Sequence, residues 1–382
     1  MKIINGKIVT PDDIIENCCI EIYDGKITNI LTSVPKSGDV IDANGGYVLP
    51  GIIDIHGDDI ETTISPRPSA RFPVDFALLN LDRINTTCGI TTKLHAIAYF
   101  EDELKGRHVG ISKKIVRVMQ HLGSEFLTHH FVHVRCEITS DLHDLLEVIE
   151  SPLVKLISLM DHTPGQGQFT DHGKYREYHK KIYGLNDVEI DEIIKKKSTN
   201  KGNKDLILQK MRDVSKRAHA RRIPIASHDD DNTQKVEFFY NIGVRILEFP
   251  ITFDAAKKGH ELGMNICMGA PNVVLGRSTS GNLSSYDAIN ADIVDVLCSD
   301  YHPQSMLYSV FILWKQGIMT LPDAVCMISL NPAMAVGMDG TIGSIEIGKR
   351  ADMLIVSEQM GIPMVTTTIV NGNIVYTKGD VI

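Results

Sequence analysis

The sequence predicts an α/β protein: a TIM-like (β/α)8 barrel with a small β-sandwich domain formed by both chain ends. Eight apolar strand-like runs alternate with helical patterns in the middle of the chain, as in a parallel βα barrel. Short strands broken by turn residues occur instead at both ends. We therefore expect residues 1–50 and 340–382 to form one composite β-domain and residues 51–339 to form the barrel. The length of 382 residues suits such a barrel with an appendage.

Each terminal segment reads as strands separated by turns. The first contains KIINGKIVT, CCIEIYDGKIT and VIDANGGYVLPG, and the last contains GSIEIGKRADMLIVS and TTIVNGNIVYTKG. Asn371 and Gly372 form a dipeptide that strongly favours a two-residue hairpin turn. Neither end has enough strand to bury a core alone, so the two ends are expected to pair.

The barrel prediction depends on apolar runs of strand length. A segment rich in Lys, Tyr and Glu, about 171–221, is too long for a loop and is predicted to be a helical excursion over one barrel face. The eight runs are residues 51–56, 90–97, 131–137, 154–161, 223–228, 244–248, 264–268 and 293–299.

Composition excludes several classes of protein. Hydrophobic residues make up 43% and charged residues 23%, and no run reaches the roughly 18 apolar residues that span a membrane. The net charge of −9 argues against a broad nucleic-acid surface. The first residues lack the apolar segment of a signal peptide, and the seven scattered cysteines contain no CxxC pair, so a cytoplasmic location is expected.

Polar residues that can bind metals follow the apolar runs. Active sites of this fold gather where the strands end, so these residues should meet at one face. His56 and Asp58 are two residues apart, and on extended backbone both would point to one side and could bind a single cation. The expected metal ligands are His56, Asp58, Glu137, His162, His228 and Asp300.

This ligand set predicts hydrolytic chemistry. Glu137 could bridge two cations, and a pair of divalent ions would lower the pKa of a bridging water toward about 7. Asp300 could bind a metal and accept a proton from the water. Mixed nitrogen and oxygen ligands suit zinc, manganese or iron. Each residue alone has a structural alternative, which we apply to His95, His133 and His260.

Loops beside these positions carry cations that suit a polyanion. Arg67 and Arg71 lie in the proline-stiffened segment PRPSARFP, and Arg277 lies in a loop rich in Gly, Ser, Thr and Asn. Lys174 and Arg176 follow His162 in the chain. Singly each would be read as a solvated surface charge, but together they predict recognition of phosphate groups.

The motifs together resemble a known superfamily. PGIIDIH, the later strand-end histidines, the terminal SD, NPAMAVG and GSIEIGKRADMLIV are similar to those of amidohydrolases, in which a metal-dependent barrel carries a β-sandwich from both chain ends. The combination of SLMDHTPGQ, ASHDD and MGAPNVV resembles more closely the diphosphatases of phosphonate metabolism. The resemblance places the first ligand pair on His56 and Asp58 and the bridging carboxylate on Glu137. The remaining ligands fall on His162, His228 and Asp300. Thr279 stands where these diphosphatases have a histidine.

The resemblance implies a hydrolase that releases pyrophosphate from a ribose bearing a 5-triphosphate and a C1 methylphosphonate. One or two divalent ions are expected, with zinc first and manganese or iron as alternatives, and Asp300 is the expected proton acceptor. One alternative is hydrolysis of an amide, cyclic amide or amidine, which includes deacetylation. The other is a non-catalytic scaffold, but all six expected ligand positions hold residues that can bind a metal, which argues against it. The expected partner is a small phosphorylated molecule, not nucleic acid or membrane, and homo-oligomerisation stays open.

Overall fold

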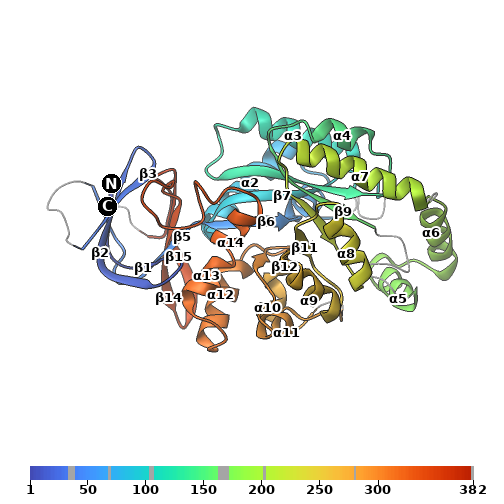
Figure 1. The fold of residues 1–382 in the computed structure, drawn as a ribbon. Helices are drawn as coiled ribbons and strands as arrows, with labels where there is room; N and C mark the ends of the chain where they lie inside the picture. The colour runs from blue at the N-terminus through green and yellow to red at the C-terminus, as the bar shows by residue number, and fades with distance from the viewer. Residues whose placement is uncertain are drawn as a thin grey trace.

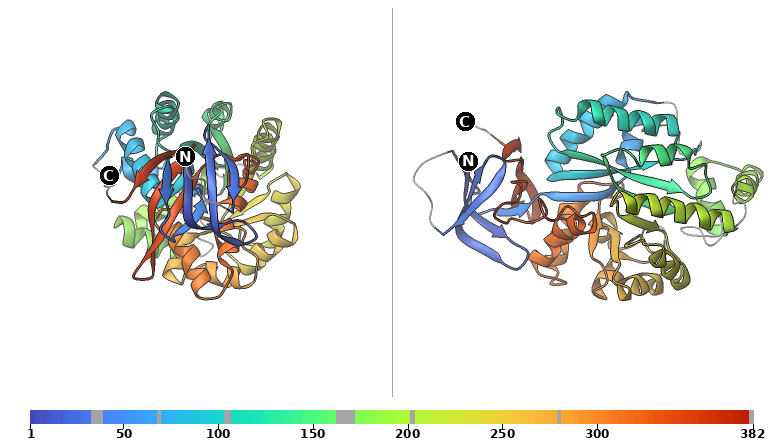
Figure 2. Two further views of the ribbon diagram at one scale, coloured as in Figure 1. Left: turned by 90° about the vertical axis from the view of Figure 1, so that its left-hand side faces the viewer. Right: turned by 45° about the horizontal axis from the view of Figure 1, so that its top comes forward.

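The computed structural model describes residues 1–32, 39–67, 70–102, 107–161, 172–200, 204–278 and 281–379. Two sheets organise the chain, an eight-stranded parallel sheet and a mixed sheet built from both chain ends (Figure 1). The predicted fold class is therefore confirmed. Figure 2 (left) shows the mixed sheet in front of helices arranged in a ring. No helix among the described residues is long and apolar enough to cross a bilayer.

The parallel sheet follows the chain order, with each strand bonded to the next. Its two outer strands meet through a parallel bridge between Gly57 and Asp300, which closes the ring. Each of the eight apolar runs of the sequence contains or overlaps one of these strands. They are β6 (Ile52–Gly57), β7 (Ile90–Ala98), β8 (His129–Glu137), β9 (Val154–Met160), β10 (Ile225–His228), β11 (Ile246–Glu248), β12 (Asn265–Gly269) and β13 (Val296–Cys298).

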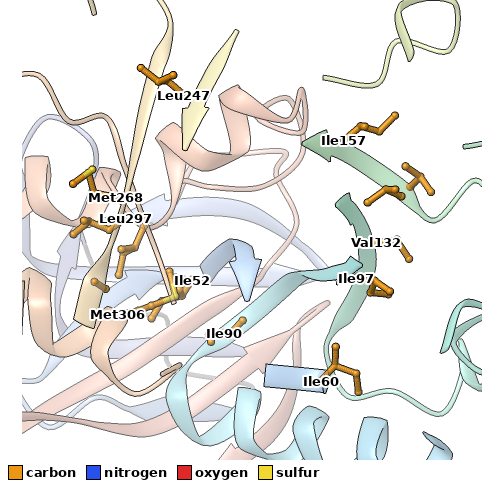
Figure 3. Close-up of a cluster of buried hydrophobic side chains, with 14 of the residues drawn as sticks. Ile52, Ile60, Ile90, Ile97, Val132, Ile157, Leu247, Met268, Leu297 and Met306 are labelled. Atoms are coloured by element: carbon orange, nitrogen blue, oxygen red, sulfur yellow. The ribbon is translucent and has the colours of Figure 1, made fainter. Parts of the chain in front are cut away.

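Alternating side chains of these strands enter two separate cores. One cluster joins residues from most of the strands, such as Ile53, Leu94 and Ile246, and only the barrel interior brings these together. The neighbouring positions, such as Ile52 and Leu247, pack in a second and larger cluster with the surrounding helices (Figure 3). Because both faces are buried, strands such as β9 and β13 read in sequence as largely apolar runs.

Fourteen helices are present in the described part of the chain. Several begin at side chains that accept a backbone N–H, as at Asn232, Thr252 and Thr320. Three of them, α5 to α7, form the predicted helical excursion. The helices are α1 (Asp59–Ile64), α2 (Val74–Cys88), α3 (Val109–Leu122), α4 (His143–Val148), α5 (His172–Tyr183), α6 (Asp187–Asn200), α7 (Lys204–Ala220), α8 (Thr233–Asn241), α9 (Phe253–Glu261), α10 (Ala270–Leu275), α11 (Ser285–Asn290), α12 (Ser305–Lys315), α13 (Leu321–Cys326) and α14 (Leu330–Ala335).

The mixed sheet has the strand order β16-β15-β14-β5-β1-β2-β3, with β4 paired to β1. Its core contains Ile3 and Ile20 from the first strands and Ile355 and Ile369 from the last. The predicted turn joins β15 to β16, and Asn371 and Gly372 both have positive φ, as a tight hairpin requires. The strands are β1 (Lys2–Val9), β2 (Ile14–Tyr23), β3 (Lys26–Leu31), β4 (Val40–Asp42), β5 (Tyr47–Pro50), β14 (Met353–Gln359), β15 (Ile362–Val370) and β16 (Asn373–Thr377). The domain boundaries at residues 50 and 340 stay a prediction.

Candidate metal centre

Three strands of the barrel bring potential metal ligands together. His56 lies near the end of β6, and His228 and Glu248 are the last residues of β10 and β11. One ligand atom from each of the three lies within 4.8 Å of those of the other two. His56 Nδ1 is 3.1 Å from Glu248 Oε1, and the two imidazole ring centres are 5.5 Å apart. We call these three residues the ligand cluster.

Side chains on neighbouring strands hold Glu248 in place. The Ser158 hydroxyl of β9 donates a hydrogen bond of 2.5 Å to Glu248 Oε2. His133 of β8 lies within hydrogen-bond distance of Ser158 and of the Ile55 carbonyl, and its Nε2 is 3.7 Å from Glu248 Oε1. Such partners fix the orientation of a ligand carboxylate. His133, interpreted from the sequence as structural, thus lies directly beside the ligand cluster.

The charge state of His56 fits a divalent cation. Burial, followed by the charges of Arg135 and His228, holds the pKa of His56 well below its ordinary value. Burial also lowers the pKa of His133 to about 3. Neutral imidazoles keep a lone pair for a metal, and two imidazoles with one carboxylate are a common donor set for zinc and related ions. The cluster can therefore hold one divalent ion.

Asp300 lies beside the cluster, two residues beyond the end of β13. Its backbone N–H donates to the His56 carbonyl and its own carbonyl accepts from Asp58 N–H, each at 2.9 Å. Burial and the negative charge of Asp58 raise the pKa of the Asp300 carboxyl to about 7, although His228 and Arg135 oppose the shift. A carboxyl group with such a pKa can accept or release a proton near neutral pH.

Asp58 does not join His56 in the cluster. Strand β6 ends at Gly57, so Asp58 occupies the cap position before α1 and the strand alternation assumed in the sequence prediction stops there. The Asp58 carboxylate instead lies 3.3 Å from Arg135 Nη1 and 3.8 Å from Arg107 Nη2, measured from Oδ2. Two arginines thus converge on this carboxylate.

The other expected ligands occupy different surroundings. Glu137 is buried at the end of β8, outside the ligand cluster, and accepts a 3.0 Å hydrogen bond from the Thr139 hydroxyl. His162 and Thr279 lie outside the described residues. Glu248 was missed because it was read only as the end of an apolar run. Its position at a strand end, which it shares with Glu137, was the signal.

Four of the five expected substrate-binding cations are less buried than Arg107 and Arg135, the two arginines beside Asp58. Arg67, Arg71 and Arg277 are exposed, and Arg176 pairs with Asp187 and Asp191 on α6. The Lys174 side chain lies outside the described part of the structure. In contrast, the residue exposures of Arg107 and Arg135 are 8% and 5%.

A buried lysine links the elements that carry the site. Lys93 of β7 lies 3.2 Å from Asp54 of β6 and 2.8 Å from Asp59 of α1. Asp54 also accepts hydrogen bonds from the backbone and side chain of Ser299, at 3.0 and 2.6 Å. A side chain at Gly57 would put its Cβ 2.8 Å from the Lys93 ammonium, which explains the glycine between His56 and Asp58. This network fixes the backbone on which those two residues lie.

Comparison with known proteins finds a matching protein family and similar proteins. The model of the amidohydrolase family matches residues 126–375. The alpha-D-ribose 1-methylphosphonate 5-triphosphate diphosphatase of Escherichia coli K12 is 33% identical over 370 residues, covering 93% of this chain and 94% of that protein. An imidazolonepropionase of Thermoplasma acidophilum is 29% identical over only 83 residues, 20% of each chain.

Solved structures share the fold. N-acetylglucosamine-6-phosphate deacetylase from Pasteurella multocida has a TM-score of 0.64 at 15% identity, covering 97% of this chain and 98% of its own. The beta-aspartyl dipeptidase from Fervidobacterium islandicum has a TM-score of 0.66 at 15% identity, covering 98% of this chain and 96% of its own. These structures support the fold only. The family match over residues 126–375, together with the relative that spans almost the whole chain, shows that this protein belongs to the amidohydrolase family.

Proposed function

We propose that this protein is a metal-dependent diphosphatase that converts alpha-D-ribose 1-methylphosphonate 5-triphosphate to the 5-phosphate and pyrophosphate. One observation carries the proposal: the 33% identity to the Escherichia coli diphosphatase extends over 93% of this chain and 94% of that protein. The ligand cluster supports the hydrolytic part, because it offers nitrogen and oxygen donors without a thiolate.

The ligand cluster would hold the first divalent ion. Zinc is the first candidate, and manganese and iron remain alternatives. A second ion would draw on the other predicted ligands, namely Asp58, Glu137, His162 and Asp300. A bound divalent cation lowers the pKa of a coordinated water and polarises a phosphoryl oxygen.

In the proposed reaction, a water oxygen forms a bond to the α-phosphorus of the triphosphate. The bond from this phosphorus to the oxygen that bridges to the β-phosphorus breaks, and pyrophosphate leaves with that oxygen. Asp300 accepts the proton of the water, for which a carboxyl pKa of about 7 is well matched. Pyrophosphate is a stable leaving group, so neutralising charge on the phosphoryl oxygens matters more than protonating the leaving group. The exposed Arg67, Arg71 and Arg277 remain candidates for outer phosphate contacts, with Lys174 and Arg176.

The test is pyrophosphate release from alpha-D-ribose 1-methylphosphonate 5-triphosphate by protein loaded with zinc, manganese or iron. His228→Ala should abolish release, whereas His260→Ala, at an exposed position on α9, should not. Release by the wild-type protein that depends on metal and on His228 supports the proposal. Absence of release with every metal, despite measured metal binding, rejects it and favours the amide-hydrolysing alternative, which yields no pyrophosphate.

The cytoplasmic location and a homo-oligomeric state remain predictions. A small phosphorylated substrate as the partner is part of the proposed function.

A further inference from the structure

Strand β8 carries three polar side chains at alternate positions. His133, Arg135 and Glu137 are spaced by two residues on extended backbone, so they share one face of the strand. His133 lies beside Glu248 of the ligand cluster, and Glu137 ends the strand. Arg135 therefore lies two residues closer to the carboxyl end of β8 than His133. Its side chain is on the same face of β8 as His133, which is the face directed toward the ligand cluster.

The Arg135 guanidinium is buried without a full set of partners. Its side chain is only 6% exposed, and Nη1 lies 3.3 Å from Asp58 Oδ2. Its Nε atom has no hydrogen-bond partner among the described residues. A guanidinium has five N–H donors, and burying unpaired donors costs free energy. A hydrogen-bond acceptor that enters the site would pair with these donors and remove the free-energy cost of burying them.

A second guanidinium stands beside the first. Arg107 Nε donates a 2.6 Å hydrogen bond to Glu61, and Arg107 Nη2 is 3.8 Å from Asp58 Oδ2. The guanidinium of Arg107 also packs against the ring of Phe100, with 5.6 Å from Cζ to the ring centre. Two buried guanidiniums therefore share one carboxylate, Asp58, next to the ligand cluster.

The positive charge of Arg135 lies beside the ligand cluster, because Arg135 follows His133 on the same face of β8 and His133 Nε2 is 3.7 Å from Glu248 Oε1. The same field would attract an anion at this place. Phosphate groups are bound well by guanidiniums, whose planar N–H donors match two phosphoryl oxygens at once.

We propose that Arg135, supported by Arg107, binds the phosphoryl groups of the substrate at the ligand cluster, and that Asp58 holds Arg135 in position when no anion is bound. The inference rests on the proposed function, since it names the residues that recognise a polyphosphate. It differs from the sequence prediction, which assigned this role to the exposed arginines and to Lys174 and Arg176.

The experiment measures binding of inorganic pyrophosphate by calorimetry to full-length, metal-loaded protein, with metal content determined for every variant. Arg135→Met should retain the metal and bind pyrophosphate at least about tenfold more weakly, because the variant loses the charge-assisted hydrogen bonds of the guanidinium. Arg135→Lys should retain the metal and have intermediate affinity, since it keeps the charge but loses the planar donors. Arg107→Met should have a smaller effect than Arg135→Met.

The matched control is Arg83→Met, because Arg83 is exposed on α2. It should bind pyrophosphate as the wild-type protein does. Equal affinities of the wild-type protein and Arg135→Met, or an equal loss in Arg83→Met, would overturn the inference. The result is separate from catalysis: binding that depends on Arg135 without pyrophosphate release would reject the proposed reaction and keep the anion site. Pyrophosphate release together with binding that does not depend on Arg135 would support the proposed reaction and reject the anion site.

Discussion

His56 Nδ1 lies 3.1 Å from Glu248 Oε1, although 192 residues separate the two in the chain. Both side chains are fully or almost fully buried. Burying a carboxylate beside a neutral imidazole costs free energy unless a cation or a further hydrogen-bond donor also contacts the carboxylate. The Ser158 hydroxyl supplies one donor to Glu248, and a divalent cation between the ligand atoms would supply the missing positive charge.

Replacing Glu248 should therefore weaken metal binding. Glu248→Gln keeps the size of the side chain but removes its charge, so metal affinity should fall at least about tenfold. Metal content after dialysis, measured by plasma mass spectrometry, checks this. Glu261→Gln on α9, where the side chain is 55% exposed, is the control and should keep the wild-type metal content. Full metal content in Glu248→Gln would remove Glu248 from the ligand set.

Metal uptake should release a proton from Asp300. Its carboxyl has a pKa of about 7, so it is partly protonated near neutral pH, and a nearby cation would favour the ionised form. Metal uptake should therefore release less than one proton from Asp300 at pH 7, more at lower pH and less at higher pH. Calorimetric metal titrations in buffers of different ionisation enthalpy measure this number. Asp300→Asn should remove this release, and unchanged release in that variant would contradict the assignment.

Removing the buried Lys93 should destabilise the fold strongly. Burial disfavours the charged ammonium, but the charges of Asp59 and Asp54 outweigh this effect and raise the pKa of Lys93. The Lys93 ammonium therefore stays charged. Lys93→Met leaves two buried carboxylates without their cation, which should lower the free energy of unfolding by about 3–5 kcal/mol. Urea denaturation measures the loss. Lys257→Met, at a lysine 58% exposed, should change stability by less than about 0.5 kcal/mol. A similarly small change for Lys93→Met would argue against the network.

Asp82 should stabilise the start of β8 in a pH-dependent manner. Its carboxylate accepts hydrogen bonds from the backbone N–H groups of Leu127 and Thr128 at 2.7 and 2.9 Å, and lies 2.9 Å from His130 Nε2. Burial raises the pKa of Asp82, but the hydrogen bonds of His130, Leu127 and Thr128 outweigh it, so the pKa is lowered. Asp82→Asn should cost about 1–3 kcal/mol at pH 7.

The sign of the pH effect follows from the lowered pKa. The contribution of Asp82 is fully present above the unfolded-state pKa of about 3.9 and is lost as the pH falls through the lower folded-state pKa. The stability difference between wild-type and Asp82→Asn should thus shrink as the pH falls below about pH 4. Denaturation curves at several pH values check this, and a difference that grows below about pH 4 would refute it.

The strands of the barrel were predictable because their pattern is local. The run from Val154 to Met160 is apolar at every position except Lys155 and Ser158, which in a parallel sheet reflects burial on both faces. The hairpin at Asn371 and Gly372 was predictable for a similar reason, since both residues favour positive φ. The ends of the strands were accurate to within a few residues.

The amino-acid sequence by itself determined the two kinds of sheet, the positions of the strands and the presence of ligand residues where strands end. The tertiary structure alone decided which of those residues meet. It brought Glu248 to His56 and His228, and it turned Asp58 toward Arg135 because β6 stops at Gly57. The physical reason is that these residues are far apart along the chain. The local sequence pattern indicates which face of a strand is buried, but only the closure of the strands into a barrel decides which side chains become neighbours.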